Sequence, residues 1–322
     1  MKIGVDVMGS DLGPRELLKS CLRFVSENDA ELVVYGNQED LSTIDHPRIF
    51  KIPTTYVLTM DDGPLAVKRH PDASMVKAIS DCAAGKNEAV VSAGSSAALL
   101  SCGVMISKMI PGIERPAFLA AIPNTLNTST VLLDMGANSE NSSDHLCQFA
   151  ILGSAFAQTT LNIDRPTIGL LNIGSEDKKG DLVHKDAVVK LRAMDKINFV
   201  GNVEGRDVLN GVVDVLVADG FSGNIALKTV EGTVVAFNQM IKEVIKTNRL
   251  TMIGGFLIKD ELTKMKDRLN YQKYGGALLA GLNHVIIKAH GSSNEEAFYN
   301  AIRQAHKLAS GGVVNKIKRD LL

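Results

Sequence analysis

The sequence predicts an α/β protein with a mostly parallel sheet that is covered by helices on both faces. Along the whole chain, a short apolar run rich in β-branched residues leads into a glycine-rich turn and then into a helical pattern. The strand-like runs are continuously apolar instead of alternating, which is typical of strands buried on both faces. No tandem repeat or long linker interrupts the 322 residues, so we expect one domain over residues 1–322.

Six strand–turn units carry this prediction. The expected strands cover residues 2–7, 89–92, 131–134, 167–173, 213–218 and 284–288, and clear helical patterns follow over 15–25, 97–109 and from 294 onward. In such sheets ligands bind outside the carboxyl ends of the strands. We therefore expect the glycine-rich turns to converge on one site.

One segment departs from the pattern, because helical patterns follow each other there without a strand between them. Residues 233–245 form an amphipathic helical pattern, and an apolar stretch at 250–258 and a basic helical pattern at 259–269 come next. The apolar residues that share a helix face in the first pattern are Val234, Phe237, Ile241, Val244 and Ile245. We expect residues 233–269 to protrude from the sheet as a helix pair.

Composition excludes some classes of function and indicates the cytoplasm. The 35 Lys and Arg nearly balance the 36 Asp and Glu, and Trp is absent, so nucleic acid is not an expected partner. The four cysteines lie far apart in apolar surroundings, which favours buried, reduced thiols. No run of about 18 apolar residues occurs, so we expect a soluble protein or one attached to a membrane surface.

The turn over residues 219–224 is the first candidate site. Its glycines, Gly220 and Gly223, allow a close approach of the backbone to a ligand, and a helix N-terminus offers free N–H groups to an anion. Asn224 either caps the helix or binds ligand. The alternative is an ordinary tight turn between a strand and a helix.

The loop between Gly174 and Gly180 is the second candidate, because it carries Lys178 and Lys179 after a strand. Lysine is a natural phosphate ligand. The glycine spacing is not that of a Walker A loop. One of the two lysines is expected to be an ordinary solvated charge.

The turn over residues 288–293 is the third candidate. His290 directly follows a strand and is a candidate general acid or base, although a lone histidine is as often structural. Ser292 is a candidate substrate contact, whereas Ser293 with Glu296 fits a helix capping box. Two weaker turns supply further candidate contacts, namely Gly136, Asn138, Gly94 and Ser95.

These blocks together resemble the phosphate acyltransferase family, the acyl-carrier-protein:phosphate transacylases of bacterial phospholipid synthesis. Seven blocks match in order over nearly the whole chain: Val5 to Gly9, Leu132 to Asn138, Gly169 to Gly174, Gly201 to Asp207, Asp219 to Thr229, Tyr274 to Ala277 and Lys288 to Asn294. The first block adds Asp6 and Gly9 as candidate substrate contacts.

The resemblance implies a fold like that of the isocitrate/isopropylmalate dehydrogenases and phosphotransacetylases, used without nicotinamide, metal or other cofactor. It implies a homodimer that moves a long-chain acyl group from acyl carrier protein to inorganic phosphate. The family's loop form favours Lys179 over Lys178. With Lys179, we expect backbone N–H groups of Gly223 and Asn224 to hold phosphate and the oxyanion, and His290 to protonate the leaving thiolate.

Two positions depart from the family pattern. Leu12 stands where the family has a histidine, and Ser95-Ser96-Ala97 replaces an Asn-Thr-Gly run. Two other functions stay open: a phosphate acetyl- or butyryltransferase that uses coenzyme A, and a non-catalytic lipid-binding or scaffolding protein.

The apolar stretch at 250–258 is flanked by cations on both sides. This pattern suits peripheral contact with an anionic membrane, and equally a dimer contact between protruding helix pairs.

Overall fold

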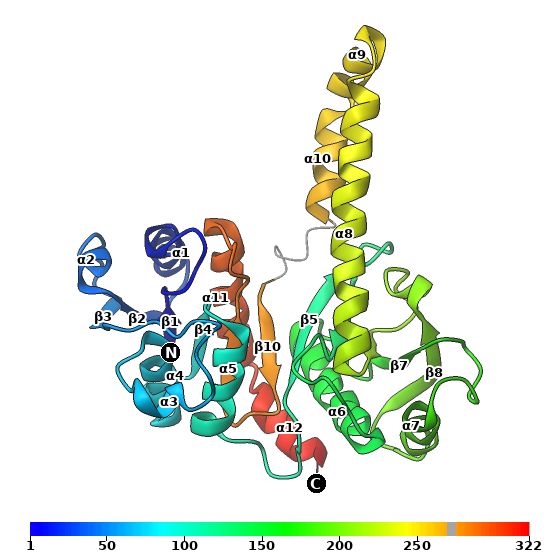
Figure 1. Ribbon diagram of the computed structural model, residues 1–322, viewed down its shortest axis with the longest axis horizontal. Helices are drawn as coiled ribbons and strands as arrows, with labels where there is room; N and C mark the ends of the chain where they lie inside the picture. The colour runs from blue at the N-terminus through cyan, green and yellow to red at the C-terminus, as the bar shows by residue number, and fades with distance from the viewer. Residues whose placement is uncertain (269–274, 322) are drawn as a thin grey trace.

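The computed structural model describes residues 1–268 and 275–321, and eleven strands form one sheet across it (Figure 1). The spatial order is β3-β2-β1-β4-β11-β10-β5-β6-β9-β7-β8. The strands are β1 (Lys2–Asp6), β2 (Glu31–Gly36), β3 (Ile49–Pro53), β4 (Ala89–Ser92), β5 (Ala117–Pro123), β6 (Ser129–Leu133), β7 (Thr167–Asn172), β8 (Asn198–Glu204), β9 (Val215–Val217), β10 (Ala277–Ala280) and β11 (Val285–Lys288).

The prediction of a mostly parallel sheet is confirmed. Only the pairs β11–β10, β10–β5 and β5–β6 are antiparallel. The six strands expected from sequence are all present, within two residues at each end. Five strands were not predicted. Two of these, β5 and β10, lie in the middle of the sheet, and each is antiparallel to both of its neighbours.

Helices cover both faces of the sheet. The described helices are α1 (Pro14–Glu27), α2 (Gln38–Leu41), α3 (Ala66–Arg69), α4 (Ser74–Ala83), α5 (Ser96–Cys102), α6 (Ser143–Thr160), α7 (Leu182–Arg192), α8 (Gly220–Ile245), α9 (Arg249–Leu257), α10 (Lys259–Arg268), α11 (Glu295–Ser310) and α12 (Val313–Leu321), with a π-helical turn (Gly103–Ser107) and a 3-10 turn (Gly205–Asp207). Buried residues of α1, α6, α7, α11 and α12 form one apolar cluster with alternate strand residues.

The opposite face has two smaller clusters. One joins α3, α4 and α5 to β4 and β10, and the other joins the first turns of α8 to β6 and β9. Along β6, Val131 and Leu133 face the large cluster and Leu132 faces α8. Neighbouring residues of one strand are thus buried on opposite faces of the sheet, which explains why the apolar runs in the sequence are continuous.

A helical protrusion rises from the body of the molecule (Figure 1). α8 is a single helix of 26 residues, and α9 and α10 follow it, with α10 returning beside α8. Leu269, the last residue of the predicted basic pattern, lies outside the described residues. Among the helices of residues 1–268 and 275–321, none combines the length and the apolarity that crossing a bilayer requires.

The apolar face predicted for 233–245 is divided between two environments. Ile245 packs against Gly255 of α9, and Val234 and Ile241 are partly buried. Phe237 and Val244 are instead exposed. The reason is that only one side of α8 contacts the returning helices.

The start of α8 lies directly against the loop that follows β6. A Cβ atom added to Gly223 would lie 2.0 Å from the main-chain oxygen of Asp134, and one added to Gly220 would lie 2.1 Å from that of Asn138. These glycines are therefore required by backbone packing. Gly232, farther along the same helix, has open space around it.

We predict opposite effects on stability for two glycine substitutions in α8. Gly223→Ala forces α8 away from Asp134 and should lower the free energy of unfolding by about 1–3 kcal/mol. Gly232→Ala meets no atom and should raise it by up to about 1 kcal/mol, since alanine is the better helix former. Urea unfolding followed by circular dichroism measures both values, and a Gly223→Ala variant as stable as Gly232→Ala would contradict the packing argument.

Candidate functional site

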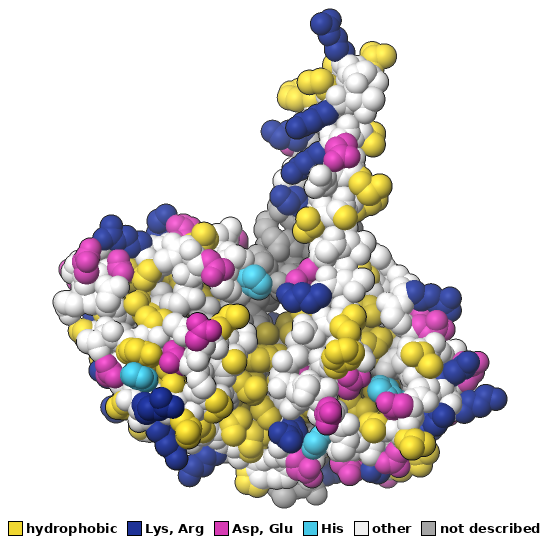
Figure 2. Space-filling model, in the orientation of Figure 1, with side chains coloured by type: hydrophobic (Ala, Val, Ile, Leu, Met, Phe, Trp, Pro, Cys, Tyr) yellow, Lys and Arg dark blue, Asp and Glu magenta, His cyan; other side chains and the backbone are white. Residues whose placement is uncertain are grey.

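A pocket of about 660 Å³ opens on the face of the sheet that carries α5 and α8. Loops that follow the parallel neighbours β1, β4 and β11 form one side of it. The loop after β6 and the first turns of α8 form the other side, with β5 and β10 between them. Figure 2 shows this hollow between the two halves of the body, with hydrophobic side chains inside it.

The loops after β1 and β4 touch each other at two glycines. A Cβ atom on Gly9, whose φ is +75°, would lie 2.9 Å from the Cα atom of Gly94. Gly9, Gly94 and Ser95, predicted as substrate contacts, all line the pocket. The loops after these two strands therefore meet as the sequence predicts.

Asp6 lies beneath this contact and does not line the pocket. Its carboxylate accepts hydrogen bonds from Ser92 Oγ (2.7 Å) and from the backbone N–H of Met8 (3.0 Å), and Ser92 Oγ in turn accepts the N–H of Gly94 (3.1 Å). Burial raises the pKa of Asp6 to about 6, against the lowering effect of these hydrogen bonds. The geometry gives Asp6 a positioning role for both loops.

The loop after β6 wraps around the carboxylate of Asp134. That carboxylate accepts the backbone N–H groups of Phe118 (3.0 Å), Gly136 (3.1 Å), Ala137 (2.9 Å) and Asn138 (3.0 Å). The side-chain amide of Asn138 also donates to it and to the carbonyl of Pro116, each at 2.8 Å. Asn138 thus holds the loop, while Gly136 lines the pocket beside Asn224.

The prediction that backbone N–H groups at the N-terminus of α8 bind an anion is wrong. The helix begins at Gly220, so the N–H of Gly223 already bonds to the carbonyl of Asp219 at 2.9 Å. The Asp219 carboxylate accepts the N–H groups of Phe221 and Ser222, and Asn141 accepts that of Gly220. Since these donors are satisfied within the protein, Asn224 meets the pocket through its side chain.

The loop with Gly174 and Lys179 does not line the pocket. The Lys179 side chain is 43% exposed, and its Nζ lies 3.9 Å from a carboxylate oxygen of Glu176. The loop lies near the N-terminus of α8, because His184 packs against Gly180 and lies 3.6 Å from Asp219, the cap of that helix. This turn thus lies near the first turn of α8 but outside the pocket that Gly9, Gly94 and Asn224 line.

His290 lies at the pocket with its ring oriented by the turn that follows. Its Nδ1 atom accepts the backbone N–H of Ser292 (3.2 Å) and lies 2.8 Å from Ser292 Oγ, so the neutral ring carries its proton on Nε2. Desolvation, then the charges of Lys288 and Lys228, lower the pKa of His290. The ring is consequently uncharged near neutral pH, and Ser292 serves to orient it.

The capping assignment for Ser293 is wrong by one residue. Asn294 is the cap of α11, since its side chain accepts the N–H of Ala297, and the helix begins at Glu295. Ser293 is buried and lines the pocket instead.

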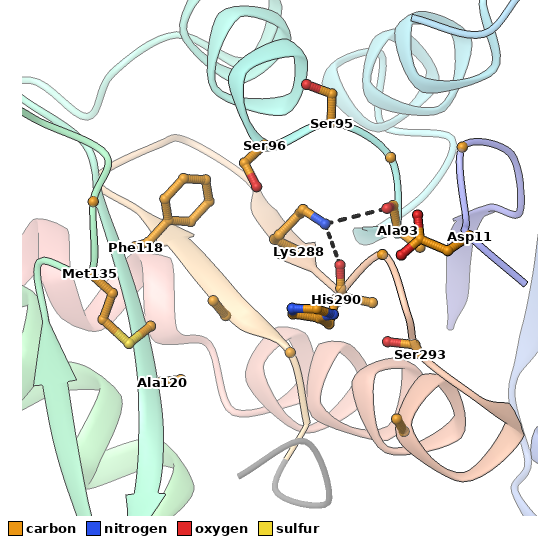
Figure 3. A pocket seen from close by; sticks show the side chains of 18 of the residues that line it. Asp11, Ala93, Ser95, Ser96, Phe118, Ala120, Met135, Lys288, His290 and Ser293 are labelled. Carbon is orange, nitrogen blue, oxygen red and sulfur yellow. Dashed lines mark hydrogen bonds between the residues drawn. The ribbon is translucent and has the colours of Figure 1, made fainter. Parts of the chain in front are cut away.

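Several lining residues were not singled out from the sequence. Lys288 belongs to the third candidate turn and to a matching block, but no role was expected for it, although a lysine at the end of a buried strand is a visible signal. Phe118, Ala120 and Met135 form an apolar wall opposite it (Figure 3). No local pattern reveals that wall, because it depends on the reversal of β5 and β10.

Covalent catalysis by a cysteine has no support in the geometry. Cys21, Cys82 and Cys102 are buried as predicted, and burial raises the pKa of each thiol to about 12. Cys147 is half-buried with its pKa raised to about 11. Within the described ranges, no group of three or more His, Cys, Asp or Glu side chains is arranged to hold a metal ion.

Comparison with solved structures confirms the predicted likeness in fold to phosphotransacetylases. A phosphotransacetylase from Streptococcus pyogenes superposes with a TM-score of 0.66 at 18% identity, covering 96% of this chain and 94% of that chain. The 4-hydroxythreonine-4-phosphate dehydrogenase from Klebsiella pneumoniae gives a TM-score of 0.54 at 15% identity, covering 96% and 98%.

Sequence comparison assigns the family. The profile described as "Fatty acid synthesis protein" matches residues 1–316. The phosphate acyltransferase of Macrococcus caseolyticus (strain JCSC5402) is 41% identical over 323 residues, covering 100% of this chain and 99% of the relative. That of Oceanobacillus iheyensis is 42% identical, covering 95% and 92%. The chain therefore belongs to the fatty acid synthesis protein family, together with the phosphate acyltransferases.

Proposed function

We propose that this protein transfers an acyl group from a thioester donor to inorganic phosphate in the central pocket. The observation that carries the proposal is the division of the pocket into a polar side and an apolar side. Lys288, His290 and Ser95 lie on the polar side, and Phe118 and Met135 form the apolar wall (Figure 3). A pocket of this kind suits a substrate pair made of an anion and an acyl chain.

The chemistry requires positioning more than covalent help. A phosphate oxygen attacks the thioester carbonyl carbon, the carbonyl electron pair moves to oxygen, and collapse of this intermediate expels the thiolate. The Asn224 amide and the Nε2–H of neutral His290 are the donors proposed to stabilise the oxyanion. Because His290 is neutral, the thiolate leaves as an anion and takes its proton from solvent.

The proposed donor is long-chain acyl carrier protein. The apolar wall supports a long acyl chain, since each methylene buried there contributes about 0.8 kcal/mol. The second candidate is transfer from acyl coenzyme A, which is favoured by the likeness in fold to phosphotransacetylases.

We also propose a homodimer and a peripheral membrane contact, made by different parts of the protrusion. Phe237, Met240 and Val244 form an exposed apolar stripe along α8, which suits the same stripe of a second copy. At the far end, Phe256 and Leu257 are each 77% exposed. Figure 2 shows hydrophobic side chains gathered there beside a row of Lys and Arg side chains.

The cations next to the apolar end support an anionic membrane surface as its partner. They include Lys246, Arg249, Lys259, Lys264 and Lys266. Each basic residue near an anionic bilayer contributes about 1 kcal/mol of attraction. In this proposal the protein is cytoplasmic and delivers a poorly soluble acyl phosphate near the bilayer.

The first prediction for this function concerns the reaction. Purified protein with long-chain acyl carrier protein and phosphate should form acyl phosphate, detected by mass spectrometry. Faster turnover of short-chain acyl coenzyme A would favour the second candidate. A folded protein without either activity at high phosphate would refute the proposal.

The second prediction compares two adjacent lysines. We propose that Lys179 contacts substrate anions entering beside α8, so Lys179→Ala should reduce kcat/KM by at least about 10-fold. Lys178→Ala, in the same loop, should change it by less than about 2-fold. Equal losses in the two folded variants would remove the assignment of Lys179.

The third prediction separates membrane contact from dimer formation. Ile253→Glu/Phe256→Glu should abolish sedimentation with anionic liposomes and leave the dimer mass unchanged in light scattering. Phe237→Glu/Met240→Glu should reduce the mass to that of a monomer. Unchanged liposome binding in the first variant would exclude the membrane contact, and its conversion to a monomer would move the dimer contact to α9.

A further inference from the structure

Lys288 brings a positive charge into the central pocket. It is the last residue of β11, and its side chain is mostly buried in the polar side of the pocket (Figure 3). Its Nζ donates to the main-chain carbonyl of Ala93 at 3.3 Å and to that of Ala289. An ammonium group has three N–H donors, so two carbonyl partners leave one donor for a ligand.

The ammonium group has no carboxylate within 4.0 Å among the described residues. Two carboxylates act on it from a distance: Asp6 beneath the loops and Asp11 from the loop after β1. His290 and, from α8, Lys228 with Glu231 also face this side of the pocket. Lys228 is paired with Glu231 at 2.8 Å.

Burial without a close counter-charge is unfavourable for a cation. It lowers the pKa of Lys288 to about 8. A dianionic ligand would supply the missing counter-charge. The hydroxyl groups of Ser96 and Ser293 point into the same side of the pocket and can donate further hydrogen bonds (Figure 3).

We propose that Lys288 is the residue that holds the attacking phosphate, with its ammonium group bound to a phosphate oxygen. This inference rests on the proposed acyl transfer to phosphate and names the residue that binds the nucleophile. Lys179 differs in being exposed, outside the pocket lining and beside Glu176. Its role is then confined to the approach of substrates.

The position of Lys288 also determines how the two substrates are oriented in the pocket. Phosphate at Lys288 lies on the side of β4 and β11, and the acyl chain lies along Phe118, Ala120 and Met135 on the side of β5 and β6. The thioester carbonyl then falls between them, at the end of the pocket that Asn224 shares with Gly136.

The test measures the KM for inorganic phosphate and the KM for the acyl donor separately. Lys288→Met should raise the KM for phosphate by at least about 10-fold and leave the KM for the donor within about 2-fold. Lys307→Met is the matched control, because Lys307 Nζ also donates to a main-chain carbonyl, that of Thr160, outside the pocket lining. It should leave both values unchanged.

Binding without turnover gives a second measurement. Inorganic phosphate should raise the melting temperature of the wild type and of Lys307→Met, and the shift should be lost in Lys288→Met. If wild type forms acyl phosphate while Lys288→Met keeps its phosphate KM and its thermal shift, the inference is wrong. A rise confined to the donor KM would also overturn it, since Lys288 would then hold the phosphodiester of the donor arm. Absence of turnover in wild type would instead reject the proposed function.

The pH dependence follows from the charge that Lys288 must carry. Its ammonium form is present below about pH 8 and is lost as pH rises through that value, so the KM for phosphate should rise between about pH 7.5 and pH 9.5. Lys288→Arg keeps its charge throughout this range and should show a flat profile. A wild-type profile as flat as that of Lys288→Arg would contradict the proposal.

Discussion

The buried carboxylate of Asp134 holds together the place where the central strands, the loop after β6 and α8 meet. It accepts four backbone N–H groups and one side-chain amide. Burial raises its pKa in spite of these hydrogen bonds, the effect of desolvation being the larger. The wall of the pocket depends on this arrangement, because Met135 and Gly136 belong to the loop that the carboxylate organises.

The same junction explains why α8 begins where it does. Gly220 and Gly223 allow the helix backbone to touch the main chain of Asn138 and Asp134. The first turn is therefore fixed by packing, and its N–H groups are capped by Asp219 and Asn141. One helix then serves two purposes, since its first turns present Asn224 to the pocket and its outer half forms the protrusion.

The pocket lies between a polar side and an apolar side. On one side, loops after parallel strands bring polar groups and Lys288 together, as is usual at the carboxyl ends of a parallel sheet. On the other side, β5 lies antiparallel to β6 and β10 and presents Phe118 and Ala120. This contrast supports a single site for an anion and an acyl chain.

The sequence by itself determined the fold class and the contact between the loops after β1 and β4. Continuous apolar runs followed by glycine-rich turns can be recognised from neighbouring residues alone. Glycine is the residue that lets two backbones approach closely, as Gly9 and Gly94 do. The sequence also indicates His290 and Asn224, each in a turn that follows a strand, and both line the pocket.

Other assignments depended on contacts between residues far apart in the chain. Whether Asn138 faces a ligand or Asp134, whether Ser293 caps a helix or lines a pocket, and whether a glycine-rich turn is free or packed all depend on which backbone lies beside it. The environment of Lys288 has the same origin, because its carbonyl partner Ala93 lies 195 residues away on the loop after β4. Only tertiary structure decides this, since the cost of burying a charge depends on the distances to its partners and not on its neighbours in sequence.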